Sequence, residues 1–402
     1  EDSMDGKYVV LRTRPSRTGD PFARAFAFPR ATEVQPADFS IEVDDLNKKE
    51  LADQLRDPEV QAVAPSMPMR LIAPRPYSLG DEAEPASQGV AWGVQAVGAD
   101  TSPYSGAGVV VAVLDTGIDA SHPAFSGMDL VQKDFTGEGN GDDNGHGTHC
   151  AGTIFGREVQ GQRIGVAPGV SKALIGKVLG RDGGGSSEEI CNAIFWAMDS
   201  GAHVIAMSLG MDFPGYQKRL QARGLPQEVA TSWALDGYRK NVQLFERLAA
   251  LVRARSAFSQ GSLLVAAAGN ESNRTQGEYW EVAVSPPAVS EGFVSVGALR
   301  RTAQGLAVAP FSNTGANICG PGVDIVSASP GGGLRSLSGT SMATPHVAGV
   351  AAHWAQKLRN SGGLVSLHLI SRLIGSGTTM GLRAEFDPLD IGAGLARCPQ
   401  QE

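Results

Sequence analysis

The sequence predicts an α/β protein with a doubly wound, mostly parallel sheet and helices on both faces, plus a small N-terminal α+β unit. Short, nearly continuous apolar runs alternate with helical stretches from about residue 90 onward. Runs of this kind are buried on both faces, like the strands of a helix-covered parallel sheet. The chain has 402 residues, of which 42% are hydrophobic, so it can bury a large core. The predicted strands are residues 108–114, 172–179, 203–209, 262–269 and 293–299.

Residues 1–75 have the pattern of a small separate unit. Within it, residues 7–13 (KYVVLRT) predict a strand, residues 44–59 an amphipathic helix and residues 60–72 a further extended segment. Residues 76–89 are rich in Pro, Gly, Ser and acidic side chains, a composition typical of linkers.

The main domain, residues 90–402, contains a long connection between two predicted strands, residues 211–261. Residues 228–258 within it have helical character, and Leu and Arg alternate between opposite faces in the last part. We therefore expect one long helix that packs along the surface.

Charge and hydropathy exclude two classes of partner. The net charge is −8 and no long basic run occurs, which argues against nucleic acid. No apolar stretch reaches the roughly 18 residues that a membrane span needs. The N-terminus, EDSMDGKYVV, lacks the apolar segment of a signal peptide, so we expect either a cytoplasmic protein or one whose signal was removed. The cysteines lack CxxC spacing and favour buried free thiols over one or two disulfides: Cys150, Cys191, Cys319 and Cys398.

Asp115 follows an apolar run and begins Asp-Thr-Gly, a tripeptide typical of two-aspartate proteases. A symmetric dyad needs a second aspartate in an equivalent loop. The candidate, Asp199, instead follows a helical stretch that Gly201 ends, so we interpret it as a helix-end residue. A zinc site on His146 and His149 is also disfavoured, because their spacing is not HExxH and no third ligand is evident.

Three other stretches supply the parts of nucleophilic catalysis. Ser341 opens a helix in GTSMATPH, so it lies at the positive end of the helix dipole. His146 lies between two glycines at a helix start in NGHGTHCAGT, which lets its ring approach another element. Asn270 ends a buried strand in AAAGN and presents an amide that can donate to an oxyanion. Taken singly, Ser341 also fits a helix N-cap and Asn270 a turn residue.

Together, DTGID, HGTHCAGT, AAAGN and GTSMATPH resemble the subtilisin-like serine proteases, with the chain order Asp, His, Ser. The resemblance covers roughly residues 90–390 and implies a subtilisin-like fold. HGTHCAGT, with Cys150 after the second histidine, is most similar to the proteinase K-type branch. Residues 1–75 resemble the inhibitory propeptide of such enzymes.

The resemblance implies a role for each motif residue. Ser341 attacks the scissile carbonyl, and His146 takes its proton and returns it to the leaving amine. Asp115 stays ionised and holds the imidazolium, while Asn270 and the Ser341 N–H stabilise the oxyanion. The substrate adds as a strand between two edges, and the three consecutive glycines predict an open subsite that tolerates bulky apolar side chains. The implied substrate-binding residues are Gly183, Gly184, Gly185, Ser208, Leu209, Gly210, Ala267, Ala268 and Gly269.

No cofactor is expected to be required, and the best-known calcium site of the family is incomplete in this sequence. HPAF places Ala124 where the family commonly has a ligating aspartate. The acidic loop GEGNGDDNG contains Asp142 and Asp143, but its spacing is not that of an EF-hand. This loop favours a solvated acidic turn over a cation site.

These features imply a secreted-type serine endopeptidase that acts on peptides and proteins, is a monomer and is made as a self-inhibited proenzyme. Residues 63–73 are expected to lie in the cleft like a product, with self-cleavage between Pro68 and Gln88. Two alternatives stay open: an interaction protein permanently locked by its N-terminal unit, and a maturation protease dedicated to one peptide. The intact set of triad residues argues against an inert scaffold.

Overall fold

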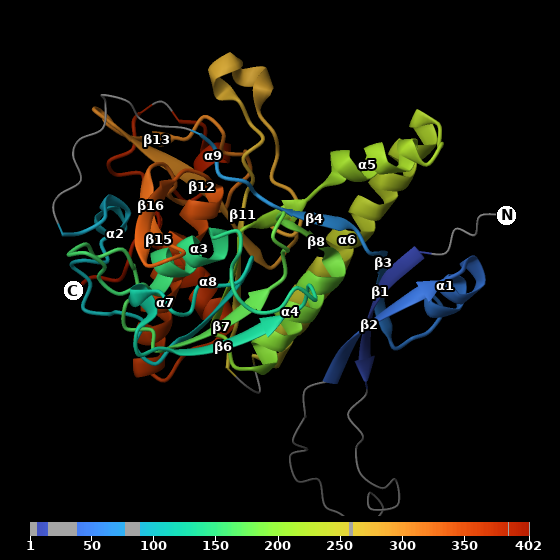
Figure 1. The fold of residues 1–402 in the computed structure, drawn as a ribbon, viewed down its shortest axis with the longest axis horizontal. Coiled ribbons are helices and arrows are strands. Elements are labelled where there is room, and N and C mark those ends of the chain that lie inside the picture. The colour runs from blue at the N-terminus through green and yellow to red at the C-terminus, as the bar shows by residue number, and fades with distance from the viewer. Residues whose placement is uncertain (1–5, 15–37, 77–88, 257–259, 385, 402) are drawn as a thin grey trace, which may run out of the picture.

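A computed structural model describes residues 6–14, 38–76, 89–256, 260–384 and 386–401. Figure 1 shows a large α/β body with a small N-terminal sheet beside it. This small sheet is antiparallel, in the order β2-β1-β3. Almost all of the linker predicted over residues 76–89 lies outside the described residues. The N-terminal elements are β1 (Gly6–Arg14), β2 (Asp38–Leu46), α1 (Lys48–Gln54) and β3 (Val60–Pro65).

The helix predicted over residues 44–59 is shorter in the structure. Residues 44–46 belong to β2, because they pair with the first residues of β1. Asn47 then caps α1, and its side-chain oxygen accepts hydrogen bonds from two backbone N–H groups of the first turn. Strand pairing therefore overrides the local helical pattern at this point.

The central sheet of the described residues has eight strands in the order β13-β12-β11-β9-β5-β7-β6, with β14 beside β12. Its pairs are parallel except for that of β12 with β13. All five strands that the sequence predicts are present in it. The strands are β5 (Val110–Asp115), β6 (Asp129–Asp134), β7 (Lys172–Lys177), β9 (Val204–Met207), β11 (Leu263–Ala267), β12 (Phe293–Thr302), β13 (Gly305–Val308) and β14 (Ile318–Pro321).

Helices cover both faces of this sheet. Val111 and Val113 of β5 pack in one apolar cluster with α3 and α7. Ala112 and Leu114, each one position further on, pack in a second cluster with α4 and α6. Because side chains alternate along a strand, this pattern confirms the predicted doubly wound α/β fold. These helices are α3 (His146–Phe155), α4 (Ser187–Asp199), α6 (Gln227–Arg255) and α7 (Thr340–Asn360).

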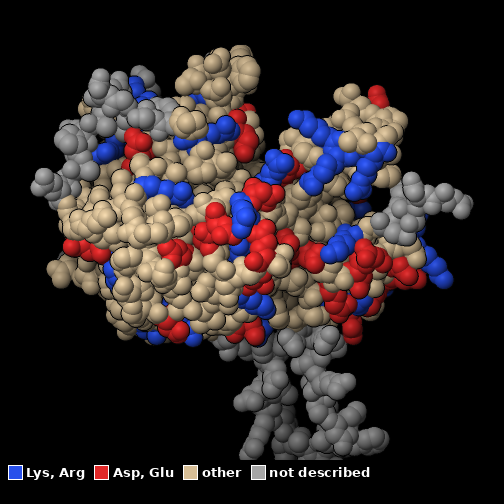
Figure 2. Space-filling view, viewed as in Figure 1, with Lys and Arg blue, Asp and Glu red and all other residues tan. Residues whose placement is uncertain are grey.

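The described part of the connection over residues 211–261, which excludes residues 257–259, contains two helices rather than one. The long helix predicted over residues 228–258 is present as α6, but α5 (Phe213–Ala222) precedes it. Figure 1 shows α6 between the body and the N-terminal sheet, where the Asn241 side chain donates a hydrogen bond to the Pro65 carbonyl at 2.9 Å. On the face drawn in Figure 2, Lys and Arg side chains collect over α5, and Asp and Glu side chains collect over the N-terminal sheet below it.

A second three-stranded sheet joins the N-terminal unit to the body. The strand β4 follows β3 closely and lies between β10 and β8, antiparallel to both. The extended segment predicted over residues 60–72 is therefore two strands that belong to two sheets. This second sheet consists of β4 (Pro68–Leu71), β8 (Gly184–Ser186) and β10 (Leu209–Met211).

The remaining elements complete the body. All four cysteines are buried and free, which confirms the prediction of buried thiols. Within the described ranges, no helix combines the length and the apolar character needed to cross a bilayer. The remaining elements are α2 (Trp92–Ala96), η3 (Pro123–Phe125), η4 (Arg274–Gln276), η5 (Glu278–Trp280), β15 (Ile325–Ser329), β16 (Gly333–Leu337), α8 (Ser366–Gly375) and α9 (Pro388–Ile391).

Candidate active site

Asp115 and His146 meet at the end of the central sheet where the parallel strands finish. Asp115 is the last residue of β5 and His146 the first of α3. The Asp115 Oδ1 lies 2.8 Å from the His146 Nδ1, and both side chains are at most 2% exposed. Gly147 permits this approach, since a Cβ there would lie 2.2 Å from the Gly117 carbonyl oxygen. The buried carboxylate holds the proton on Nδ1 and leaves Nε2 as the acceptor.

Two opposing effects act on the His146 imidazole. Burial is the largest single effect and disfavours its charged form, but the neighbouring Asp115 carboxylate and Cys150 sulfur favour that form and together outweigh burial. The pKa of His146 is therefore raised well above its usual value. An imidazole in this position accepts a proton readily and stabilises the resulting charge against the carboxylate.

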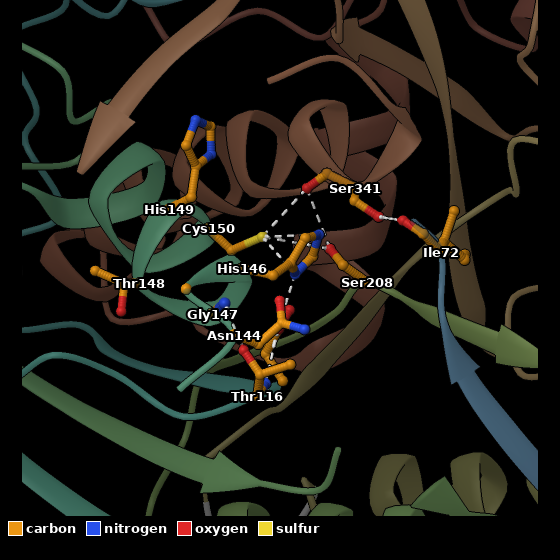
Figure 3. Close-up of polar contacts among 12 residues, drawn as sticks. Ile72, Thr116, Asn144, His146, Gly147, Thr148, His149, Cys150, Ser208 and Ser341 are labelled. Carbon is orange, nitrogen blue, oxygen red and sulfur yellow. Dashed lines mark hydrogen bonds and ion pairs between the residues drawn. The ribbon is translucent and has the colours of Figure 1, made fainter. Parts of the chain in front are cut away.

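Ser341 lies in the first turn of α7 and is fully buried. Its hydroxyl donates a hydrogen bond to the Ile72 carbonyl oxygen at 2.8 Å, as Figure 3 shows. Among the hydrogen bonds of the described residues, none joins Ser341 to His146. The serine is thus engaged by the chain segment that covers it.

Asn270 follows β11 and is held by the start of α7. Its Oδ1 accepts hydrogen bonds from the Thr340 N–H and hydroxyl at 2.8 and 2.9 Å. These bonds direct Nδ2 into the cleft, where it donates to the Ala73 carbonyl oxygen at 2.9 Å. Gly339 keeps this space open, because a Cβ there would lie 2.9 Å from the Asn270 Nδ2.

The strand β4 occupies the cleft in front of Ser341. The Leu71 N–H donates to the Gly183 carbonyl at 2.8 Å, and the Ile72 N–H donates to the Ser208 carbonyl at 3.3 Å. The strands β8 and β10, which contain four of the nine predicted substrate-binding residues, therefore enclose one extended segment. This is how an added peptide strand binds between two edges.

The arrangement of Asp115, His146, Ser341 and Asn270 can be compared with known proteins. The family model described as "Subtilase family" matches residues 106–374. The chain belongs to the subtilase family. As a subtilase it is a subtilisin-like serine endopeptidase that acts on peptide substrates.

Several curated subtilases are similar to this chain. M-protease from Shouchella clausii (strain KSM-K16) and Subtilisin BL from Lederbergia lenta are each 38% identical over 279 residues. The match covers 67% of this chain, 61% of M-protease and 86% of Subtilisin BL, so less than two thirds of M-protease is represented. An "Intracellular serine protease" from Paenibacillus polymyxa is 34% identical over 255 residues, 61% of this chain and 66% of that protein.

A cavity of about 670 Å³ opens beside Ile72 in the subtilase cleft. Its lining includes residues that sequence reasoning missed: Glu271 and Ser285 from the body, Phe213 and Tyr238 from the connection. The connection begins directly after β10, and this position in the sequence was the one indication that it could contribute side chains to the cleft. Of the nine predicted binding residues, Gly210 lines this cavity. Ala267, Ala268 and Gly269 are buried in β11 and the turn after it.

Cys150 lies one turn after His146 and packs against its ring. Its Sγ is 3.7 Å from the His146 Nδ1, and the thiol donates to the Ser341 carbonyl at 3.3 Å. Among the described residues, the ligand atoms of Asp115, His146 and Cys150 lie within 4.8 Å of one another. A metal needs a thiolate and a free imidazole nitrogen. Here burial raises the pKa of the thiol, and Nδ1 is bound to the carboxylate, so this donor set suits proton transfer better than a metal.

The structure also explains two residues that the sequence excluded from catalysis. The His149 side chain points away from His146 in Figure 3, and its Nε2 contacts the Ile325 carbonyl at 3.0 Å. Burial lowers the pKa of His149 to about 3. Asp199 is the last residue of α4 and forms an ion pair with Arg255 at 3.6 Å, as expected for a helix-end residue.

The acidic loop before α3 is paired within the protein. Asp142 accepts hydrogen bonds from two threonine hydroxyls and from the backbone N–H groups of Gly145 and Thr148 at the start of α3. Asp143 forms an ion pair with Arg181 at 2.8 Å. Ala124 is fully buried, and its methyl group offers no ligand oxygen.

Proposed function

We propose that this subtilase hydrolyses peptide bonds through Ser341, His146 and Asp115. The Ser341 Oγ attacks the substrate carbonyl carbon while the His146 Nε2 takes the hydroxyl proton. The proton then passes to the leaving nitrogen as the C–N bond breaks, and water hydrolyses the acyl-enzyme ester with His146 again as base. The 2.8 Å contact between Asp115 and His146 supports these roles most directly, because it leaves Nε2 free to accept a proton.

Asn270 and the Ser341 N–H would stabilise the oxyanion that forms in this reaction. The support is the fixed Asn270 amide, whose nitrogen already donates to a carbonyl oxygen in the cleft. A donor that is oriented before the reaction needs no reorganisation as charge develops.

Residues 1–75 would act as an intramolecular inhibitor of the domain that begins near residue 90. The continuous chain from the N-terminal sheet through β4 covers Ser341, which is fully buried. A nucleophile buried in this way cannot meet a second peptide. We therefore expect the uncut chain to be inactive toward external substrates until the segment leaves.

Within residues 68–88, the Ile72–Ala73 bond is our proposed site of self-cleavage, upstream of the predicted linker. The β4 hydrogen bonds to both rims end at Ile72, and the Ser341 hydroxyl reaches the Ile72 carbonyl. Asn270, however, donates to the next carbonyl, that of Ala73. This offset of one residue supports an inhibited resting state, in which the Asn270 amide must move to the Ile72 carbonyl before attack.

The side chains of the bound segment suggest which substrates fit. Ile72 is 4% exposed and Met69 is 1% exposed, so apolar side chains fill two subsites. The glycines of β8 leave room along one rim. We propose a preference for apolar residues at these two positions, which agrees with the open subsite that the sequence predicts.

Incubation of the full chain followed by intact-mass measurement tests the proposed mechanism and cleavage site. We expect the wild-type chain to separate into two fragments, the second beginning at Ala73. The Ser341→Ala variant should stay whole, whereas Ser336→Ala, at an exposed serine, should be cut like the wild type. A wild-type chain that stays whole, or a Ser341→Ala chain that is cut, contradicts the mechanism. A cut at another bond contradicts only the position.

The two alternative functions give different results in this experiment. A permanently locked interaction protein stays whole and hydrolyses no added peptide; the offset of Asn270 is the observation that favours it. A dedicated maturation protease cuts itself but then hydrolyses only one sequence in a peptide library. We favour the broader endopeptidase, because most contacts to β4 are made by backbone groups.

We further propose that the reaction needs no metal or cofactor, that the enzyme is monomeric and that it acts outside the cytoplasm. The triad and water suffice for acyl transfer. A precursor blocked by its own chain would protect the proteins of the cell that makes it. Addition of a chelator should leave the self-cleavage rate unchanged, and a loss of rate that calcium restores would contradict the first point.

A further inference from the structure

The rim of the cleft carries one acidic side chain that binds the occupying strand. The Arg70 Nε lies 2.8 Å from the Asp212 Oδ2. Arg70 is the residue of β4 two positions before Ile72, and it pairs across the ladder with Gly210. It is also the one charged residue of β4.

The Asp212 carboxylate is held in place by the enzyme body rather than by Arg70. Its Oδ1 accepts the Gly215 N–H at 3.0 Å and so caps α5. Its backbone N–H donates to the Pro68 carbonyl at 3.0 Å, which places the residue against the bound strand. Its Oδ2 is buried and, among the described residues, has Arg70 as its one ionic partner. The carboxylate is therefore oriented toward the cleft before any peptide arrives.

Release of β4 would leave this carboxylate without its counterion. The Asp212 side chain is 12% exposed in the occupied cleft, and it belongs to the connection that stays with the body. A buried carboxylate favours a nearby cation, since burial disfavours an unpaired charge. A guanidinium on an incoming peptide restores the pairing that Arg70 supplied.

We propose that Asp212 is a specificity-determining residue that selects a basic side chain two positions before the residue that acylates Ser341. This inference rests on the proposed function, in which β4 lies as a substrate does. The other contacts of the bound strand are made by apolar pockets and backbone groups, so Asp212 adds a charged subsite to the cleft. The connection over residues 211–261 gains a role from it, because α5 is the element that fixes Asp212.

Peptide hydrolysis after self-cleavage is complete tests the assignment. The substrates are quenched fluorescent peptides with the core Pro-Met-Arg-Leu-Ile-Ala-Pro and the same core with Ala or Glu in place of Arg. The readout is the ratio of kcat/KM between the Arg and Ala peptides. We expect a ratio of about three- to tenfold for the wild type, since the arginine head is largely exposed and solvent weakens such pairs. The Glu peptide should be the poorest of the three.

Three variants and one control locate the effect. Asp212→Asn should bring the ratio close to one, and Asp212→Lys should make the Glu peptide better than the Arg peptide. Gly215→Ala keeps the charge but places a Cβ 1.9 Å from the Asp212 Oδ2, so it should also lower the ratio. Glu228→Gln removes the same charge from the first turn of α6 and should leave the ratio at the wild-type value.

The outcomes separate this inference from the proposed function. If all peptides are cut but Asp212→Asn keeps the wild-type ratio, Asp212 does not determine specificity. If Arg70→Ala slows self-cleavage while the peptides show no preference for Arg, the ion pair serves only the inhibitory segment, and the inference is wrong. The Ser341→Ala variant should cut none of the peptides. If the wild type also cuts none of them, the proposed function itself fails.

Discussion

The catalytic centre and the cleft beside it hold the same chain segment by different means. At the centre, Asp115, His146 and Asn270 are each at most 2% exposed and each is fixed by a hydrogen bond. Along the cleft, backbone groups of β8 and β10 bind β4, and β8 begins with glycines. Asp212 is the exception in the cleft, because it binds β4 through a charged side chain. In the proposed mechanism the chemistry would thus depend on a few side chains, whereas binding would depend on a backbone shape that tolerates many sequences.

Replacing Asp115 by Asn breaks the centre and has the largest expected effect. The amide no longer fixes the His146 tautomer or stabilises the imidazolium, so the rate of self-cleavage should fall about 10⁴-fold. The measurement is the first-order appearance of the fragment that begins at Ala73. Asp129→Asn, at an exposed aspartate of β6, is the matched control and should react at the wild-type rate. A loss of less than tenfold in Asp115→Asn would contradict the role given to this carboxylate.

The pH dependence of the same reaction sharpens this prediction. A protonated His146 cannot accept the Ser341 proton, so the rate is low below its pKa and rises as the pH passes that value. Because Asp115 raises the pKa of His146, the wild-type midpoint should lie above about 6.5, the ordinary value for histidine. In Asp115→Asn burial still acts but the carboxylate that opposes it is gone, so the midpoint should move down. A midpoint that does not move would show that the pair is not coupled.

Replacing Asn270 by Ala removes one donor from the centre and should lower kcat about 100- to 1000-fold, the size of effect known for such a donor in subtilisin, the namesake of this family. The KM for a peptide should change little, because the bond strengthens in the transition state. Steady-state kinetics on the self-cleaved enzyme measure both. A raised KM with unchanged kcat would place Asn270 among the binding groups of the cleft instead.

The four motifs taken together, rather than any one local pattern, predicted the centre. The strands before Asp115 and Asn270 are apolar runs, and the helices at His146 and Ser341 begin at glycine-flanked motifs, so each residue could be placed on its element. The parallel sheet then brings strand ends to one edge. The role of each residue stays a proposal that the variants test.

The cleft was less predictable, because its contacts join distant segments. The pair of Arg70 and Asp212 spans two parts of the chain that no local pattern relates. The first residues of the predicted helix over 44–59 joined β2, since pairing with β1 decided their conformation. Asn270 donates to the Ala73 carbonyl, one residue beyond the Ile72 carbonyl, and this offset depends on the register of the bound segment in the cleft. Propensity and periodicity carry no information on such register.

Replacing Met67 by Ala tests how the N-terminal unit holds β4 in the cleft. Met67 is fully buried, its Sδ packs over Gly237 of α6, and its N–H donates to the Ser187 hydroxyl at 3.0 Å. Truncation of such a side chain removes at least about 2 kcal/mol. In the Ser341→Ala background, which keeps the chain whole, amide exchange of β4 should then accelerate about 30-fold.

Leu55→Ala is the matched control for Met67→Ala. Leu55 is an apolar residue of the same N-terminal unit but is 63% exposed, so its truncation should leave β4 exchange unchanged. Equal exchange in both variants and the parent would show that the rims alone hold the strand. In that case the N-terminal unit would not help to hold β4 in the cleft, despite the buried contacts of Met67.

Replacing Gly183 by Ala has the smallest expected effect and tests the backbone rim directly. Gly183 has φ of +78°, where a Cβ costs about 1–2 kcal/mol, and that Cβ would lie 3.0 Å from the Leu71 Cβ. For a peptide with Leu at that position, kcat/KM should fall about five- to tenfold, and less for a peptide with Gly there. Gly184→Ala is the control, because its Cβ meets only the end of the Asp182 side chain at 3.1 Å, which can move. Equal losses in the two variants would mean that neither position of this rim tolerates a side chain. The cleft would then accept fewer sequences than the comparison with the catalytic centre implies.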